Sequence, residues 1–255
     1  MRAPVWAPPL LAVQFLTRIP VPPLARLNAA QAEDGLARAM AWLPPVGTLI
    51  GIVTAAVYVA AAHVWPPTIA ALLALAVEAL LTGAFHEDAV ADFCDAFGGT
   101  ARGDAALRIM RDSRIGTYGT LGLGLSVALR FACILALPIG LVVPAIVAAA
   151  TVARLWAVLL AAILPATGAG VAARFGSGLP PRRVLLAMLL TLPGIAPLLW
   201  MQPVTMLASV AVAAVFLGWI TRFLRARIGG STGDCLGFSA YMGQLTVLLL
   251  AVSLA

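Results

Sequence analysis

The sequence predicts an all-α protein, a polytopic membrane helix bundle of about seven spans that forms a single domain over residues 1–255. Of the 255 residues, 62% are hydrophobic and only 10% are charged, whereas a soluble domain carries about 25% charged residues. Long apolar segments alternate with short segments that hold most of the arginines. The net charge of +6 therefore indicates arginine-rich loops beside a lipid bilayer and not a nucleic-acid partner.

The elements follow from the spacing of apolar runs, prolines and glycines. Residues 1–38 form an N-terminal cytoplasmic or interfacial segment, because prolines at 20, 22 and 23 forbid a continuous helix and the apolar run before them is too short to span. Apolar length then predicts the spans 40–62, 68–85, 120–137, 145–164, 184–200, 204–221 and 237–255. The first of these is expected to bend near Pro44 and Pro45. Residues 138–144 are expected to form an uncharged turn, and 201–203 a tight one.

The arginines set the orientation. The segments 1–38, 86–117, 165–183 and 222–236 hold fourteen of the sixteen arginines, and the turns between the other ends of the spans hold none. Cytoplasmic loops of membrane proteins carry such an excess of positive charge. The N-terminus and these four segments are therefore expected in the cytoplasm, with the chain a multi-pass membrane protein.

Six of the ten acidic residues fall within residues 83–119. If residues 85–97 are helical, Asp88, Asp92 and Asp95 are spaced i, i+4 and i+7 and project from one face. Like charges at that spacing repel, so a bound cation is the natural compensation. Oxygen ligands without a Cys or His cluster favour Mg²⁺ or Mn²⁺ over Zn²⁺. The alternative is a solvated loop whose mixed charges interact only with water.

Arginines follow this acidic segment directly. Arg111 and Arg114 suit phosphate, because a guanidinium binds oxyanions through two parallel hydrogen bonds. Together the two features predict metal-assisted handling of a diphosphate at the cytoplasmic face. His86 adjoins the carboxylates, which makes it a candidate general base or phosphate-positioning group.

Other polar residues stand apart from this segment. Glu78, Arg130 and Arg154 lie within expected spans, where charges usually face the bundle interior. They are interpreted either as a polar floor beneath the site or, for Glu78 and Arg130, as a structural pair between helices. The sequence GGSTGD at 229–234 lies on the same side as the acidic helix and offers Thr232 and Asp234 as an acceptor and a metal ligand. The cysteines at 94, 133 and 235 are expected to be free thiols.

These motifs resemble those of the cobalamin synthase family, also called adenosylcobinamide-GDP ribazoletransferase. The resemblance covers nearly the whole chain in order and rests on five stretches: H-x-D-x-x-x-D-x-x-D at 86–95, IMRDSRIGTYG at 109–119, GGSTGD at 229–234, FLTRIP at 15–20 and PVG at 45–47. The chain has Asp-Ala-Val-Ala-Asp at 88–92 where the family usually has Asp-Gly-Leu-Ala-Asp. It also has Tyr241 and Gln244 near positions where the family often has glutamates.

The resemblance implies a reaction in which the 3′-hydroxyl of α-ribazole, or of its 5′-phosphate, attacks the cobinamide-bearing phosphorus of adenosylcobinamide-GDP and releases GMP. It implies Mg²⁺ on Asp88, Asp92 and Asp95, with Asp234 completing the metal site. His86 or Asp112 would take the hydroxyl proton. Substrate and phosphate groups would be held by Arg111, Arg114, Ser113, Thr117, Arg18, Arg154 and Thr232. Association with other corrinoid-pathway enzymes and formation of a homo-oligomer are left open.

Other hypotheses about the function fit the sequence less well. The CDP-alcohol phosphotransferases are also membrane enzymes that need a metal, but their signature D-x-x-D-G-x-x-A-R has no match here. Aromatic prenyltransferases typically carry two aspartate-rich motifs. A transporter would place its polar residues at broken helices near the middle of the membrane, whereas this chain places most of them in expected cytoplasmic loops.

Overall fold

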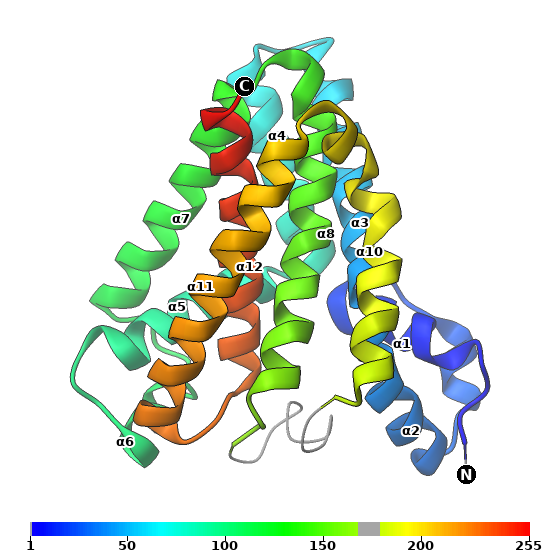
Figure 1. Ribbon diagram of the computed structural model, residues 1–255, viewed down its shortest axis with the longest axis vertical. Helices are drawn as coiled ribbons and strands as arrows, with labels where there is room; N and C mark the ends of the chain where they lie inside the picture. Colours follow the sequence, from blue (N-terminus) through cyan, green and yellow to red (C-terminus); the bar gives the residue numbers. More distant parts are fainter. Residues whose placement is uncertain (1, 168–178) are drawn as a thin grey trace.

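The computed structural model describes residues 2–167 and 179–255, and in these two ranges the only β-structure is one isolated bridge between Ala166 and Ser231. The all-α prediction is confirmed for this part of the chain (Figure 1). Residues 168–178 of the expected loop 165–183, including Arg174, lie outside the described residues. The helices and helical turns are α1 (Ala7–Leu16), η1 (Pro22–Arg26), α2 (Ala29–Ala39), η2 (Met40–Trp42), α3 (Leu43–Ala62), α4 (Pro67–Thr82), α5 (Phe85–Gly98), α6 (Gly103–Ile109), α7 (Thr117–Ala136), α8 (Ile139–Ile163), α10 (Pro181–Met201), α11 (Pro203–Ile228) and α12 (Gly233–Ser253).

Among the described residues, six helices are long and apolar enough to cross a membrane, and a seventh span arises if the pair α4 and α5 is counted as one. The pair is bent by 86°. Because α5 carries four carboxylates in fourteen residues and turns away from α4, we place α5 outside the spanning part and regard α4 as the span. Length and composition thus support six or seven spans, in agreement with the predicted number of about seven.

The arrangement of the ends also follows the expected alternation. The N-terminus, α5, α6 and the connection between α11 and α12 lie at one end of the bundle, and the C-terminus lies at the other (Figure 1). The described arginine-rich segments thus gather at one end, as the sequence predicts.

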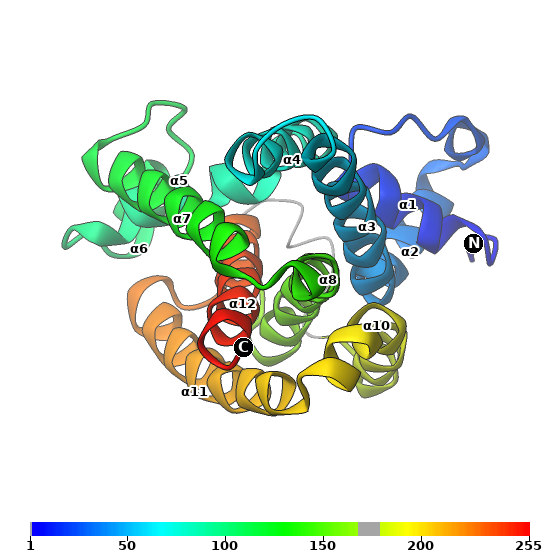
Figure 2. The ribbon, with the colours of Figure 1, turned by 90° about the horizontal axis from the view of Figure 1, so that it is seen from above.

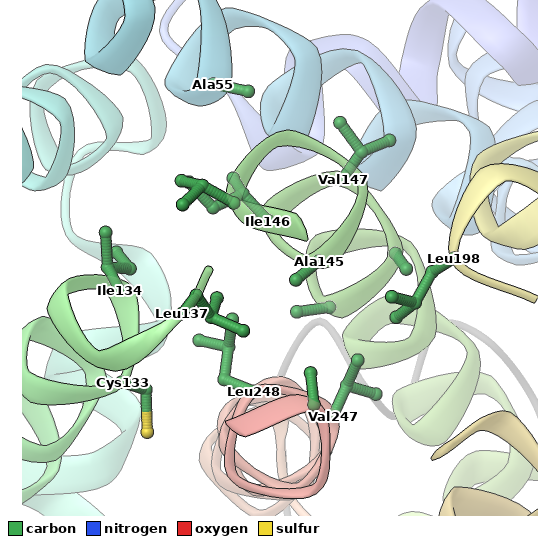
Figure 3. Packing of buried hydrophobic residues seen from close by; sticks show 14 of the residues in the cluster. Ala55, Cys133, Ile134, Leu137, Ala145, Ile146, Val147, Leu198, Val247 and Leu248 are labelled. Carbon is green, nitrogen blue, oxygen red and sulfur yellow. The ribbon is translucent and has the colours of Figure 1, made fainter. Parts of the chain in front are cut away.

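Helix α8 forms the centre of the bundle, packed between α3, α10 and α12 (Figure 2). Every residue from Pro144 to Arg154 is buried, which fits a helix that is apolar on all sides. In the largest apolar cluster, Ala145, Ile146 and Val147 of α8 pack together with side chains of α3, α7 and α12 (Figure 3).

Glycines let α3 approach α8 closely. A Cβ atom on Gly47 would lie 2.4 Å from the carbonyl oxygen of Ala150, and one on Gly51 would lie 2.8 Å from Cα of Val147. Small residues at such contacts allow membrane helices to pack backbone against backbone. These glycines therefore set the close spacing between α3 and α8.

Two predictions that rest on prolines are wrong, because these prolines lie within helices or at their starts. The expected bend at Pro44 and Pro45 is wrong, since both lie in the first turn of α3, where a missing N–H costs nothing. The expected turn 138–144 is also wrong beyond Pro138, because α8 begins at Ile139 and includes Pro144. Membrane helices tolerate such a proline where neighbouring helices cover it.

We predict that Gly47→Ala destabilises the bundle by about 1–3 kcal/mol, the usual cost of forcing extra volume into a packed core. The added methyl group meets backbone atoms of α8, which cannot move aside as a flexible side chain could. Thermal unfolding of the purified protein in detergent measures the effect. Gly124→Ala is the matched control, because a Cβ there meets no atom within 4 Å. Equal melting temperatures for the two variants would contradict the prediction.

Candidate active site

A sharp elbow between α4 and α5 directs the acidic helix across the end of the bundle. Gly83 (φ 71°) and Ala84 (φ 55°) both adopt left-handed backbone conformations. This conformation suits glycine but strains alanine. The N-terminal segment supports the elbow, since the backbone N–H of Arg18 donates to the carbonyl of Leu81 at 2.7 Å and its guanidinium lies against Gly83.

The predicted helix over 85–97 is confirmed as α5, and its acidic face lines a pocket of about 470 Å³. Asp88 and Asp92 form one wall together with Glu87. The opposite wall is the segment between α6 and α7, which contributes Met110, Arg111, Asp112, Ser113, Arg114 and Ile115. The pocket therefore brings carboxylates and guanidinium groups to a single cavity, as the spacing of the two motifs predicts.

Asp95 holds these two walls together. Its two carboxylate oxygens accept the backbone N–H groups of Gly116 and Gly119, each at 2.7 Å. A Cβ on Gly116 would lie 2.6 Å from Asp95, and one on Gly119 would lie 2.3 Å from it. The glycines of the IGTYG motif are thus explained: they let a carboxylate cap the N-terminus of α7 at close range.

Asp112 and Arg114 form an ion pair within the pocket wall. The guanidinium donates to both carboxylate oxygens, at 3.0 and 2.7 Å, and the backbone N–H of Arg114 donates to the carboxylate at 3.1 Å. These hydrogen bonds lower the pKa of Asp112 to about 2. Asp112 is therefore a poor proton acceptor while Arg114 remains bound to it.

Asp92 lies in the opposite electrostatic environment. Burial, followed by the charges of Asp88, Asp234 and Asp95, raises the pKa of Asp92 to about 7. Helix α12 packs against α5, and Asp234 in the first turn of α12 therefore lies near the carboxylates of α5 although it is far away in the sequence. Like-charged neighbours thus raise the pKa of a carboxylate in this pocket. A divalent cation would relieve their repulsion, so the pocket suits such an ion.

The GGSTGD motif fixes the start of α12. The backbone N–H of Ser231 donates to the carbonyl of Pro165 at 2.9 Å, and a Cβ on Gly230 would lie 2.7 Å from the same oxygen. The hydroxyl of Thr232 accepts the N–H of Cys235 at 3.3 Å and donates to Sδ of Met110 at 3.0 Å. Thr232 is therefore a helix cap that contacts the pocket wall from behind.

Arg227 is a residue of this region that the sequence analysis did not single out. It donates to the carbonyls of Phe97 and Gly99, at 3.1 and 2.8 Å, and so caps the C-terminus of α5. Its guanidinium also lies 5.3 Å from the ring centre of Phe223. An arginine in the last turn of one helix gives no sequence signal that its partner is the end of another.

Several predicted site residues lie outside the pocket lining. His86 is only 6% exposed, on the face of α5 opposite the acidic residues, and burial with the charges of Arg154 and Arg130 lowers its pKa well below the usual value. Arg154 is buried in α8 and donates to the carbonyl of Ala150 at 3.2 Å. Thr117 and Arg18 are exposed nearby. The structure brings together Asp88, Asp92, Arg111, Asp112, Ser113 and Arg114.

The carboxylates of the pocket are candidate ligands for a metal ion. Within residues 2–167 and 179–255, no three His, Cys, Asp or Glu side chains are already arranged as a metal centre. The donor chemistry nevertheless fits Mg²⁺, since Asp88 and Asp92 offer carboxylate oxygens in an open pocket and Asp234 acts on both electrostatically. The cysteines at 94, 133 and 235 are free, as predicted.

Comparison with known proteins gives consistent matches. The family model described as cobalamin-5-phosphate synthase matches residues 8–252. A protein of Ralstonia pickettii named adenosylcobinamide-GDP ribazoletransferase is 37% identical over 251 residues, which is 95% of this chain and 94% of the relative. Proteins of the same name from Azorhizobium caulinodans (38%; 93% of this chain, 92% of the relative) and Shewanella frigidimarina (34%; 96% and 94%) are also similar. No solved structure matches the chain.

We predict that Asp92→Asn raises the melting temperature of the metal-free protein at pH 8. A carboxyl whose pKa is raised in the folded state destabilises the fold increasingly as the pH rises from its ordinary value, here 3.8, to its raised value of about 7, and the full cost is present above that pH. The gain should shrink as the pH falls from 8 to 5, because folded Asp92 is then protonated. Thermal unfolding in EDTA over this pH range measures it, and a gain that does not change with pH would contradict the assignment.

Proposed function

The chain belongs to the cobalamin-5-phosphate synthase family, and we propose that it joins α-ribazole, or α-ribazole 5′-phosphate, to adenosylcobinamide-GDP with release of GMP. This is the nucleotide-loop assembly step of cobalamin biosynthesis. The observation that carries the proposal is the pocket itself, in which Asp88 and Asp92 face Arg111 and Arg114. One cavity thereby offers both a place for a cation and guanidinium groups for a diphosphate.

Mg²⁺ is the proposed cofactor, held by Asp88, Asp92 and Asp234. Asp95 adjoins this set: each of its oxygens accepts one backbone N–H and keeps a second lone pair for a further ligand. When bound, Mg²⁺ would neutralise diphosphate charge and favour departure of GMP. The cation-binding wall is held in place because contacts at both ends of α5 tie this helix to its neighbours.

The arginines of the opposite wall would hold the diphosphate. Phosphoryl transfer depends mainly on positioning and charge neutralisation, and a guanidinium supplies both. Arg111 and Arg114 are exposed to the pocket, and Asp112 orients Arg114 before substrate arrives. Ser113 lies between them and offers a hydroxyl for a phosphate oxygen.

Asp112 is the better placed of the two proton acceptors that the sequence suggests, because it lines the pocket and His86 does not. Its low pKa results mainly from its hydrogen bonds with Arg114. When Arg114 turns to bind phosphate, the pKa of Asp112 would return toward its ordinary value. The carboxylate could then accept the proton of the attacking ribose hydroxyl, so that phosphate binding and proton acceptance are coupled through one arginine.

The orientation in the membrane follows from charge. The end of the bundle that holds the pocket also holds the described arginine-rich segments. By the positive-inside rule this end would face the cytoplasm, where the nucleotide substrates are found. The protein would then be a multi-pass protein of a bacterial inner membrane.

The proposal is tested with purified protein in liposomes, adenosylcobinamide-GDP, α-ribazole or its 5′-phosphate, and Mg²⁺. We predict that cobalamin, or its 5′-phosphate, and GMP appear together and that EDTA abolishes both. Asp92→Asn and Arg111→Ala should each lower kcat by about 100- to 1,000-fold, the usual cost of removing a group that stabilises transition-state charge.

Asp104→Asn and Arg108→Ala are the matched controls, since both residues are exposed on α6 and neither lines the pocket. They should retain the activity of the unaltered protein. Folded protein that forms no product from either ribazole substrate would contradict the function. Full activity of Asp92→Asn, with an unchanged requirement for Mg²⁺, would contradict the metal site alone.

A further inference from the structure

A group of four charged side chains lies inside the bundle, beneath the pocket. Glu78 on α4, Arg130 on α7 and Arg154 on α8 are 3%, 3% and 1% exposed. The side chain of Glu87 on α5 is 16% exposed. Two negative and two positive charges balance, which lowers the cost of burying them. Placing charged side chains inside a membrane protein costs free energy. The assembly of the spans alone therefore does not explain why this group is present.

Glu78 contacts three side chains from three other helices. Its carboxylate forms an ion pair with Arg130, accepts the hydroxyl of Thr54 on α3 at 2.8 Å, and accepts the amide of Gln244 on α12 at 3.4 Å. Helices α3, α4, α7 and α12 therefore meet at one carboxylate. The expected pairing of Glu78 with Arg130 is confirmed.

Arg130 extends this arrangement across the elbow. One terminal nitrogen contacts Glu78 on α4, and the other lies 3.5 Å from Oε1 of Glu87 on α5. The guanidinium also lies 6.0 Å from the ring centre of Tyr241. Arg130 thus links the helices on both sides of the 86° bend, where the left-handed residues Gly83 and Ala84 interrupt the regular helix.

Glu87 connects the buried group to the active site. It lines the pocket and immediately precedes Asp88 in α5. Since Asp88 and Asp92 belong to the same helix, a tilt of the first turn of α5 at Glu87 would also move their carboxylates. A displacement of about 1 Å at a reacting group can lower a rate about 100-fold.

We propose that Arg130 is a positioning residue that, through Glu78 and Glu87, sets the angle of α5 and so directs Asp88 and Asp92 into the pocket. This inference rests on the proposed function of that pocket. A purely stabilising role is the alternative, but a buried ion pair contributes little net stability and can often be replaced by apolar residues of similar volume. The two roles can therefore be separated by experiment.

The decisive variant is the double substitution Glu78→Met with Arg130→Met. It removes one charge of each sign, leaves Glu87 and Arg154 as a balanced pair, and preserves the volume of the buried region. We expect a melting temperature in detergent near that of the unaltered protein, with kcat lowered about 10- to 100-fold, as for other supports of functional groups. KM for adenosylcobinamide-GDP should change less than twofold, because Arg111 and Arg114 are untouched.

Thr48→Val with Thr151→Val is the matched control. It removes a hydroxyl pair, 2.9 Å apart, between α3 and α8, and neither residue lines the pocket. Its kcat should equal that of the unaltered protein. If the double methionine variant does not fold, Arg130→Lys decides in its place, since an ammonium group keeps the charge but cannot contact Glu78 and Glu87 through two separate nitrogens.

Full kcat in the folded double variant, or in Arg130→Lys where that variant decides, would overturn the proposal and leave Arg130 as a structural residue. Glu87→Gln tests the remaining explanation, in which Glu87 acts directly in the pocket. If Glu87→Gln lowers kcat while the double variant does not, Glu87 acts directly and Arg130 does not position it. Failure of the proposed function would be seen differently, as absence of product from the unaltered protein.

Discussion

The two hydrogen bonds from the backbone of α7 to Asp95 hold together the parts of the candidate site. They join α5, which carries the cation-binding carboxylates, to the segment that carries the phosphate-binding arginines. Gly116 and Gly119 are required because a Cβ at either position would collide with the carboxylate. Two motifs that appear separate in the sequence are thus a single structural unit, and the pocket exists only while that unit is intact.

The bundle supplies the fixed frame for this unit. Helix α8 is buried at the centre and closely approached by α3, and α12 places Asp234 near the acidic helix. Helix α5 is held at its first turn by Arg130, at Asp95 by α7 and at its last turn by Arg227. Three contacts along fourteen residues explain how a helix that leaves the direction of the spans can still present carboxylates in a defined place.

Periodicity and composition are enough to predict the spans, the helix over 85–97, the single arginine-rich end and the pairing of Glu78 with Arg130. The same periodicity places His86 on the face opposite Asp88 and Asp92, so its burial was already implied. What spacing cannot show is that Asp95, in register with those two, is engaged by backbone groups more than twenty residues away. Nor does it show the elbow, since a left-handed alanine has no sequence signal, and the role of Glu87 depends on that elbow.

The most direct test is an experimental structure of the protein in a lipid nanodisc with Mg²⁺ and adenosylcobinamide-GDP, determined with an antibody fragment bound to the opposite end. We predict that the diphosphate lies between the carboxylates of Asp88 and Asp92 and the guanidinium of Arg111, with the cation on the carboxylate side. A diphosphate bound elsewhere in the protein, with this pocket filled only by solvent, would contradict it.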